Sequence, residues 1–222
     1  MRQNSPKSEL ELFDRAKSIA GQTLAQLAKL SNQSIPDSTK SSKGWVGNLL
    51  EDVLGATAST SPEPDFIELG IELKSIPISS NGKPRESTYV CVVQLKAEAQ
   101  SSWEKSLVYK KLSHVLWIPY ETDANIPFAA RHIGNPILWK PDKDQLFAIK
   151  RDWQEFSDKI CLGKLHEITA EAGQCLQIRL KAAQSSIITK DTNQTDNQQL
   201  DTLPRGYYLR SSFTEQILNN AK

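Results

Sequence analysis

Three polar residues near the middle of the chain have the types and spacing of a metal-dependent hydrolytic site. They are Asp65, Glu72 and Lys74, in the segment PDFIELGIELK. From Ile71 onward, apolar and charged residues alternate, which predicts a strand with one buried face. Ile71 and Leu73 would point into a core, and Glu72 and Lys74 would lie side by side on the other face.

The turn before this strand would bring Asp65 close to it. Gly70 can adopt backbone angles that other residues rarely take, so the preceding segment can fold back against the strand. Two carboxylates placed this close repel each other unless a divalent cation lies between them, and oxygen ligands suit magnesium. A neighbouring lysine can polarise a metal-bound water or stabilise developing negative charge. The same spacing also occurs by chance on solvated strands, so an ordinary charged strand stays open as an alternative.

The composition sets limits on the class of protein. The chain has 222 residues and a formal net charge of +1, so it can bury one sizeable core, and any nucleic-acid surface must be local. Three cysteines and three histidines are scattered without metal-site spacing, which favours packing or surface roles and a reducing compartment. The sequence has neither an apolar run long enough to span a bilayer nor a signal peptide, which predicts a soluble, cytoplasmic protein without a membrane partner.

Helices and strands are both expected, in an order that is not a simple alternation. Helical spacing predicts helices over residues 9–20, from 23 onward, over 43–54, 103–112 and 151–162, and after 211. Strands are expected from 71, over 88–95 (a central strand), 114–120 and 176–181, and more weakly over 135–138 and 146–149. The polar tract 184–201 is expected to be a mobile loop, ended by a turn over 203–210. The fold class is therefore α/β (mixed α+β), around one central sheet.

The last third of the chain carries a second group of chemically similar residues. Arg179 and Lys181 are expected on the outward face of one strand, where Gln177 would also lie. Tyr208 and Arg210 are expected on the following turn, with Arg205 nearby. Lysine and arginine neutralise phosphates, arginine can read guanine, and aromatic rings pack on bases. An ordinary charged surface explains these residues equally well. A metal site elsewhere in the same chain favours a phosphodiester substrate.

Five segments resemble the MutH family of DNA mismatch-repair endonucleases. They are, in order, KGWVGNLLEDVLGA, PEPDFIELGIELKSIP, VYKKLSHVLWIP, LQIRLKAA and LPRGYYL. The resemblance runs from about Leu10 to the last helix and is weakest in the polar tract. It implies a PD-(D/E)xK, restriction-endonuclease-like fold, with a central mixed sheet flanked by helices. Residues 1–222 would form a single endonuclease domain, with a lobe over about 1–150 that carries the catalytic motif and a DNA-recognition lobe over 151–222, around a DNA-binding cleft.

The resemblance also implies roles for individual residues. Asp65, Glu72 and the main-chain carbonyl of Leu73 would hold Mg²⁺, which Ca²⁺ or Mn²⁺ could replace in binding. Lys74 would orient or activate the attacking water.

Two further catalytic residues follow from the resemblance alone. Glu51 becomes an active-site carboxylate, although its place on a helix favours a solvated side chain. Lys111 becomes a catalytic or phosphate-contacting lysine, although a basic residue at a helix C-terminus usually only answers the helix dipole.

The implied DNA-binding positions lie in both halves of the chain. Lys43, Tyr89, Arg179 and Tyr208 fall where the family contacts DNA or senses adenine methylation. The chemistry of Lys181 and Arg205 adds these two residues to the DNA-binding set.

The implied activity is Mg²⁺-dependent nicking of the unmethylated strand of double-stranded DNA at hemimethylated GATC sites. MutL and MutS would stimulate it, and the enzyme would act as a monomer. A GATC-type restriction endonuclease of the same fold is one alternative, and a catalytically idle DNA-binding module is another. Nicking of hemimethylated and of unmethylated duplexes separates the repair enzyme from the restriction enzyme.

Overall fold

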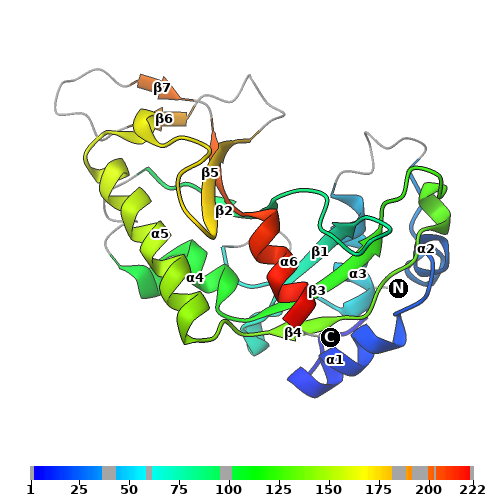
Figure 1. The fold of residues 1–222 in the computed structure, drawn as a ribbon. Coiled ribbons are helices and arrows are strands. Elements are labelled where there is room, and N and C mark those ends of the chain that lie inside the picture. Colours follow the sequence, from blue (N-terminus) through cyan, green and yellow to red (C-terminus); the bar gives the residue numbers. More distant parts are fainter. Residues whose placement is uncertain are drawn as a thin grey trace. The chain divides into compact units, whose positions relative to one another are not determined.

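The computed structural model describes residues 3–36, 44–58, 62–95, 102–181, 189–191, 200–202 and 204–220. These residues fold into two compact units of mixed α/β structure (Figure 1). One unit comprises Met1–Glu86, Ser113–Lys140 and Ile217–Lys222, and the other comprises Ser87–Leu112 and Pro141–Gln216. In the described part of the chain, no helix combines the length and apolar character that crossing a bilayer requires.

The first unit is built on a three-stranded mixed sheet. Strand β1 (Glu72–Ile78) pairs in parallel with β3 (Val115–Glu121), and β3 pairs antiparallel with β4 (Ile137–Trp139). The order β1-β3-β4 leaves β1 at an edge. The helices of this unit are α1 (Glu9–Ser18), α2 (Leu24–Ser31) and α3 (Trp45–Leu54), with 3₁₀ turns η1 (Ile67–Leu69) and η4 (Phe128–Ala130).

Local sequence signals explain where these helices begin and end. The Ser8 side chain caps α1, and Thr23 and Gln26 form a reciprocal capping box at the start of α2. Gly55 ends α3 in the left-handed conformation. The apolar faces of the three helices and of the sheet then form one buried cluster, which includes Leu12, Leu24, Leu27, Leu49, Leu50, Ile71, Leu73, Leu116 and Ile118.

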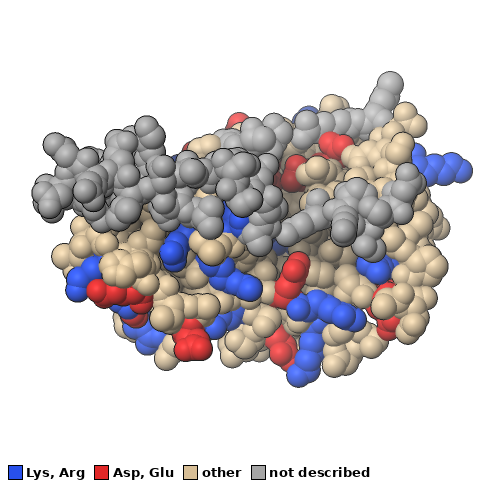
Figure 2. All heavy atoms as spheres, turned by 90° about the horizontal axis from the view of Figure 1, so that it is seen from above, with Lys and Arg blue, Asp and Glu red and all other residues tan. Residues whose placement is uncertain are grey.

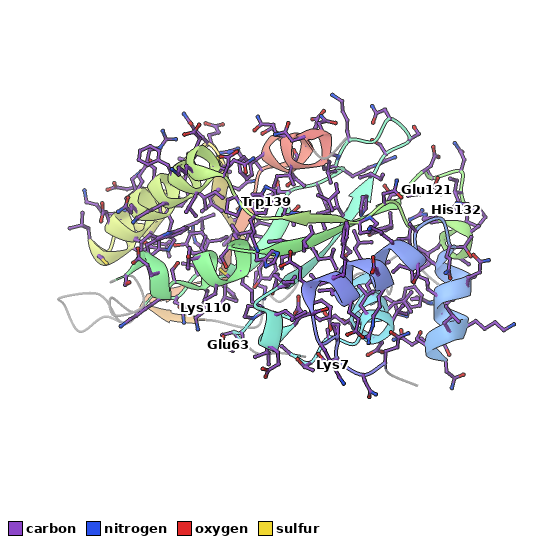
Figure 3. The ribbon with its side chains drawn as sticks, turned by 90° about the horizontal axis from the view of Figure 1, so that it is seen from below. Lys7, Glu63, Lys110, Glu121, His132 and Trp139 are labelled. Atoms are coloured by element: carbon purple, nitrogen blue, oxygen red, sulfur yellow. The ribbon has the colours of Figure 1, made fainter. Side chains whose placement is uncertain are left out.

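The connection between β3 and β4 is held by a pair of side chains. Oε2 of Glu121 accepts hydrogen bonds from the backbone N–H of His132, at 2.9 Å, and from its ring Nδ1, at 2.8 Å. Figure 3 shows the two side chains next to each other. These bonds lower the pKa of Glu121, chiefly through the backbone N–H.

The second unit is built on an antiparallel sheet of order β2-β8-β5. Its strands are β2 (Thr88–Val92), β8 (Arg205–Leu209) and β5 (Leu176–Leu180). The helices are α4 (Leu107–Leu112) and α5 (Lys143–Cys161), with 3₁₀ turns η3 (Trp103–Lys105) and η5 (Leu165–Glu167). Strands β6 (Thr189–Asp191) and β7 (Leu200–Thr202) pair with each other, and α6 (Ser211–Asn220) follows β8.

The mixed class is confirmed, but the expectation of one central sheet is wrong. The described strands form two three-stranded sheets and one two-stranded pair. The predicted turn over 203–210 is mostly strand β8, which lies in the centre of its sheet, and β2 is an edge strand rather than a central one. The weak strand at 146–149 is helical, because Asp142 and Gln145 form a capping box that starts α5 at Lys143. Within the tract 184–201, β6 and the first residues of β7 are strand rather than loop, and the rest of it lies outside the described residues.

Candidate active site

The turn predicted before β1 is present, and it brings Asp65 to the strand. Phe66 and Ile71 pair across it, with N–O distances of 2.9 and 3.3 Å, and Gly70 has φ of 64°. A left-handed residue is required to close this turn, which explains a glycine at this position. The short 3₁₀ turn η1 (Ile67–Leu69) fills the space between the paired residues.

Both the side chain and the main chain of Asp65 are held in place. Its Oδ2 accepts a hydrogen bond from the backbone N–H of Leu73 at 2.8 Å. Its carbonyl oxygen accepts from the N–H groups of Thr57, at 2.9 Å, and Ala58, at 3.2 Å. The carboxylate therefore lies against β1 at Leu73, the residue between Glu72 and Lys74.

Glu72 and Lys74 form an ion pair on one face of β1. Nζ of Lys74 lies 2.6 Å from Oε1 of Glu72, and the Glu72 residue is only 3 % exposed. Ile71 and Leu73 belong to the buried apolar cluster, as predicted, but Glu72 on the other face is buried too, so the expectation of a single buried face is wrong at this residue. A carboxylate so deeply buried needs positive charge nearby, and Lys74 supplies it.

The direction of the peptide groups decides what else faces Asp65. The N–H of Glu72 donates to the carbonyl of His114 at 3.0 Å, on the side of β1 that faces β3. Successive residues of a strand turn their N–H and C=O groups to opposite sides, so those of Leu73 face the open edge of β1. The carboxylate of Asp65 is bonded on that edge. The Leu73 carbonyl and the Asp65 carboxylate therefore lie along the same edge.

These donors suit a hard divalent cation. Two carboxylates and a main-chain carbonyl are oxygen ligands, and Mg²⁺ is commonly held by one or two carboxylates with water completing its shell. Among the residues that the structure describes, no three His, Cys, Asp or Glu side chains gather into a metal-binding cluster. A cation at this edge would accordingly depend on Asp65, Glu72, the Leu73 carbonyl and water.

Glu51 belongs to the same unit as these residues and is partly buried on α3. Helix α3 packs against β1, where Gly47 lies against the side chain of Ser75. Residues four apart share a helix face, so Glu51 lies one turn beyond Gly47 on the face directed at β1.

Lys111 belongs to the second unit. It lies on α4 and is 9 % exposed. A lysine at a helix C-terminus is usually exposed and interacts favourably with the helix dipole. A buried lysine at this position is unusual. Lys43 falls outside the described residues.

Four of the predicted DNA-binding residues lie on one face of the sheet of the second unit. The rings of Tyr89 and Tyr208 are 5.4 Å apart at an angle of 67°. The guanidinium carbon of Arg179 lies 5.9 Å from the centre of the Tyr208 ring, and Nζ of Lys181 lies 5.1 Å from that of Tyr89. We call these four residues the ring cluster. Both tyrosines are partly exposed and both basic residues are exposed, so the cluster is available to a ligand.

Arg205 is separated from the ring cluster by the pleat of β8. It pairs with Leu180 in register, whereas Tyr208 pairs with Gln177. Because residues of odd and even position along β8 point to opposite faces, Arg205 lies on the side of Tyr207 and not of Tyr208. Within the part of the chain that the structure describes, its buried Nε has no hydrogen-bond partner.

Two polar residues of this region have structural partners that the sequence did not indicate. Gln177, expected to point outward, is 6 % exposed, and its amide donates to Oγ of Ser87 at 2.7 Å. Arg210 donates to the carbonyls of Ala170, Ala172 and Gly173 at 3.0, 2.9 and 2.9 Å. Alternation along a strand predicts the face of Gln177 but not a buried partner on that face.

Acidic and basic side chains are mixed on the surface of the protein, which is not uniformly basic (Figure 2). Figure 2 shows acidic and basic side chains interspersed on the described part of the visible face, in keeping with the net charge of +1. One unit carries carboxylates beside a lysine, and the other carries aromatic rings in contact with basic side chains. Both features are typical of enzymes that hydrolyse nucleic acids.

Comparison with known proteins identifies the family. Residues 54–152 match the family described as "DNA mismatch repair enzyme MutH". The DNA mismatch repair protein MutH of Vibrio vulnificus (strain YJ016) is 49 % identical over 216 residues, which cover 97 % of this chain and 95 % of the relative. The protein of the same name from Shewanella sp. (strain W3-18-1) is 47 % identical, with 97 % and 96 % covered. The chain belongs to the MutH family of DNA mismatch repair enzymes, as its sequence motifs predict.

Proposed function

We propose that the protein is an Mg²⁺-dependent endonuclease that nicks the unmethylated strand of hemimethylated GATC sites during mismatch repair. The observation that carries this proposal is the placement of Asp65, Glu72 and Lys74 together at the edge of β1. Membership of a family of mismatch repair enzymes supports DNA as the substrate. The restriction-endonuclease-like fold, with two lobes around a DNA-binding cleft, is part of the same proposal.

The residues at the edge of β1 divide the work. Asp65, Glu72 and the carbonyl of Leu73 would hold the cation, and the Leu73 N–H keeps the Asp65 carboxylate turned toward that edge. A bound Mg²⁺ lowers the pKa of a coordinated water and neutralises charge on a phosphodiester. Lys74, 2.6 Å from Glu72, places an ammonium where it can orient the attacking water and stabilise the negative charge that develops on the phosphate.

Glu51 and Lys111 have supporting roles in this proposal. Glu51, on the face of α3 directed at β1, would add a third carboxylate to the active site, beside Asp65 and Glu72. Lys111 would contribute a cation to a phosphate of the substrate, since a buried ammonium interacts more strongly with an anion than an exposed one does.

The second unit would supply DNA recognition. Arg179 and Lys181 can contact phosphates or base edges, and the rings of Tyr89 and Tyr208 offer apolar surface to bases. A methyl group on N6 of adenine occupies the major groove and changes a hydrogen-bond donor there, so a closely fitting ring such as Tyr208 can penalise it. Lys43 and Arg205 are proposed as further DNA contacts.

The proposal includes the other proteins of the pathway. A nick in one strand needs a single active site, so a monomer suffices. MutL and MutS would tie nicking to a mismatch, and a chromosomal DNA substrate places the enzyme in the cytoplasm.

The proposal is tested with a short duplex that contains one GATC site in unmethylated, hemimethylated or fully methylated form. Strand-resolved nicking is measured with Mg²⁺, with EDTA, and with and without MutL. The expected result is Mg²⁺-dependent nicking of the unmethylated strand only, with full methylation protecting both strands. Asp65→Asn should abolish it, and Glu68→Gln should not, because Glu68 is an exposed carboxylate of η1.

Other outcomes assign the alternatives. Rapid cleavage of both strands without MutL would indicate a restriction endonuclease. Binding of the duplex without nicking under every condition would indicate an idle DNA-binding module and would overturn the proposal.

A further inference from the structure

Gly206 lies in the centre of the ring cluster, on the middle strand of its sheet. It pairs with Val92 of β2 on one side and with Arg179 of β5 on the other. Tyr208 is two residues further along β8, so it projects from the same face as Gly206 would. The position is therefore surrounded by the cluster that the proposed function assigns to DNA.

The space where a side chain of residue 206 would lie is filled by the two rings. A Cβ atom built on Gly206 would lie 2.8 Å from Cε2 of Tyr89 and 3.1 Å from Cε2 of Tyr208. It would also lie 3.3 Å from the carbonyl oxygen of Cys91. Carbon atoms in van der Waals contact are about 3.5–4.0 Å apart, so both rings would have to move.

Backbone conformation does not explain this glycine. Gly206 is not one of the described glycines that have left-handed backbone angles. A glycine inside a strand is unfavourable by roughly 0.5–1 kcal/mol relative to alanine. Such a residue in a central strand often marks a close approach of other atoms, and here those atoms are the two tyrosine rings.

The rings in turn position the charges. The rings of Tyr89 and Tyr208 lie over Gly206 and contact each other edge to face. Each ring also contacts one basic side chain. Lys181 lies over the first ring and Arg179 over the second, each near the distance of a cation–π contact. A shift of the rings would therefore change both cation–ring contacts.

We propose that Gly206 is a specificity-determining position, where the missing side chain seats the rings of Tyr89 and Tyr208 and so sets the shape of the surface that meets adenine in the GATC site. This inference rests on the proposed function. Gly206 acts through the two rings and takes no part in hydrolysis at β1.

The test compares Gly206→Ala with the wild type in two separate assays. Binding of hemimethylated and fully methylated GATC duplexes is measured in EDTA, where no nicking can occur, and nicking rates are measured in Mg²⁺. We expect Gly206→Ala to weaken binding of the hemimethylated duplex about ten-fold, as loss of a base–aromatic contact does. The ratio between the two duplexes should fall toward one, and kcat at saturating DNA should change much less than KM.

A double-mutant cycle separates ring seating from general damage. Tyr89→Ala removes the ring with the shortest contact, so Gly206→Ala should have a clearly smaller effect in that background. Leu180→Ala is the control for disturbance of the sheet, because Leu180 is half exposed on the opposite face, and it should leave both assays unchanged. Thermal unfolding of each variant confirms that a folded protein is compared.

Other outcomes of the binding assays and the cycle contradict the inference. It fails if Gly206→Ala binds and discriminates like the wild type, or if its effect simply adds to that of Tyr89→Ala. It also fails if the double variant does not fold, since relief of the clash should restore the sheet. A wild type that binds the duplex in EDTA but never nicks it would overturn the proposed function. The ratio of binding between the two duplexes would still test the role of Gly206 in that case.

Discussion

The backbone N–H of Leu73 donates to Oδ2 of Asp65 at 2.8 Å, which ties the two arms of the turn before β1 together. This bond holds the carboxylate of Asp65 against a strand residue that lies eight positions further along the chain. It also turns the Asp65 carboxylate toward the edge of β1 that the Leu73 carbonyl faces. The geometry of the candidate metal site therefore depends on a bond that also stabilises the turn.

The two roles of Asp65 can be separated by a pair of variants. Asp65→Asn keeps an oxygen that can accept the Leu73 N–H but removes the negative charge, whereas Asp65→Ala removes both. We expect both variants to lose nicking by about two orders of magnitude or more, since a metal ligand is lost. Only Asp65→Ala should lower the free energy of unfolding, by about 1 kcal/mol. Urea unfolding and a nicking assay measure the two effects, and full activity of Asp65→Asn would contradict the assignment.

The ion pair of Glu72 and Lys74 predicts a non-additive effect on stability. The Glu72 side chain is 4 % exposed, so Lys74→Met leaves a carboxylate in a poorly solvated place without the ammonium 2.6 Å away. Removing one member of such a pair costs about 3 kcal/mol. Lys74→Met combined with Glu72→Gln should be more stable than Lys74→Met alone, because the buried charge is gone. Urea unfolding of the two single variants and the double variant measures the coupling, and additive losses would show that the pair does not interact.

The turn and its strand could be predicted because their information is local. The left-handed Gly70 and the alternation from Ile71 to Lys74 both lie within a few residues, and the turn and the buried apolar face are confirmed. The partners of a strand depend on distant parts of the chain, which explains why two sheets replaced the one expected. The segment that carries Tyr208 looks like a turn, with Pro204 and Gly206, but becomes a central strand because β2 and β5 pair with it on both sides. The space requirement at Gly206 is likewise set by Tyr89 from another strand.

Asp152 is expected to contribute strongly to the stability of the second unit. Its Oδ2 accepts hydrogen bonds from the N–H groups of Gln174, Cys175 and Leu176 at 2.8, 2.6 and 3.0 Å, at the start of β5. Asp152→Ala leaves these N–H groups without that acceptor and should lower the free energy of unfolding by about 3 kcal/mol.

Two matched variants sharpen this prediction. Asp152→Asn keeps one acceptor oxygen and should lose less than Asp152→Ala. Asp144→Ala removes an exposed carboxylate from the first turn of the same helix and should cost under about 1 kcal/mol. Chemical denaturation compares the three, and equal losses for Asp152→Ala and Asp144→Ala would show that the Asp152 bonds contribute little.

Cys175 predicts a loss of stability at alkaline pH. Burial, with a smaller contribution from the charge of Asp152, raises the pKa of the Cys175 thiol to about 11, from an ordinary value of 9.0. The native state therefore keeps its proton at a pH where the unfolded chain has lost it. Stability that is fully present below pH 9 should fall as the pH rises toward 11.

The size and origin of this loss can be measured with variants. Allowing for partial solvent screening, the thiol accounts for about 1 kcal/mol between the two pKa values. Urea unfolding from pH 8 to 11 under reducing conditions should show a smaller alkaline loss for Cys175→Ala than for the wild type. Some loss remains in that variant, because burial also raises the pKa of Tyr207. Asp152→Asn should narrow the pH range of the loss, since removing its charge lets the thiol ionise earlier, and an unchanged alkaline slope in Cys175→Ala would refute the prediction.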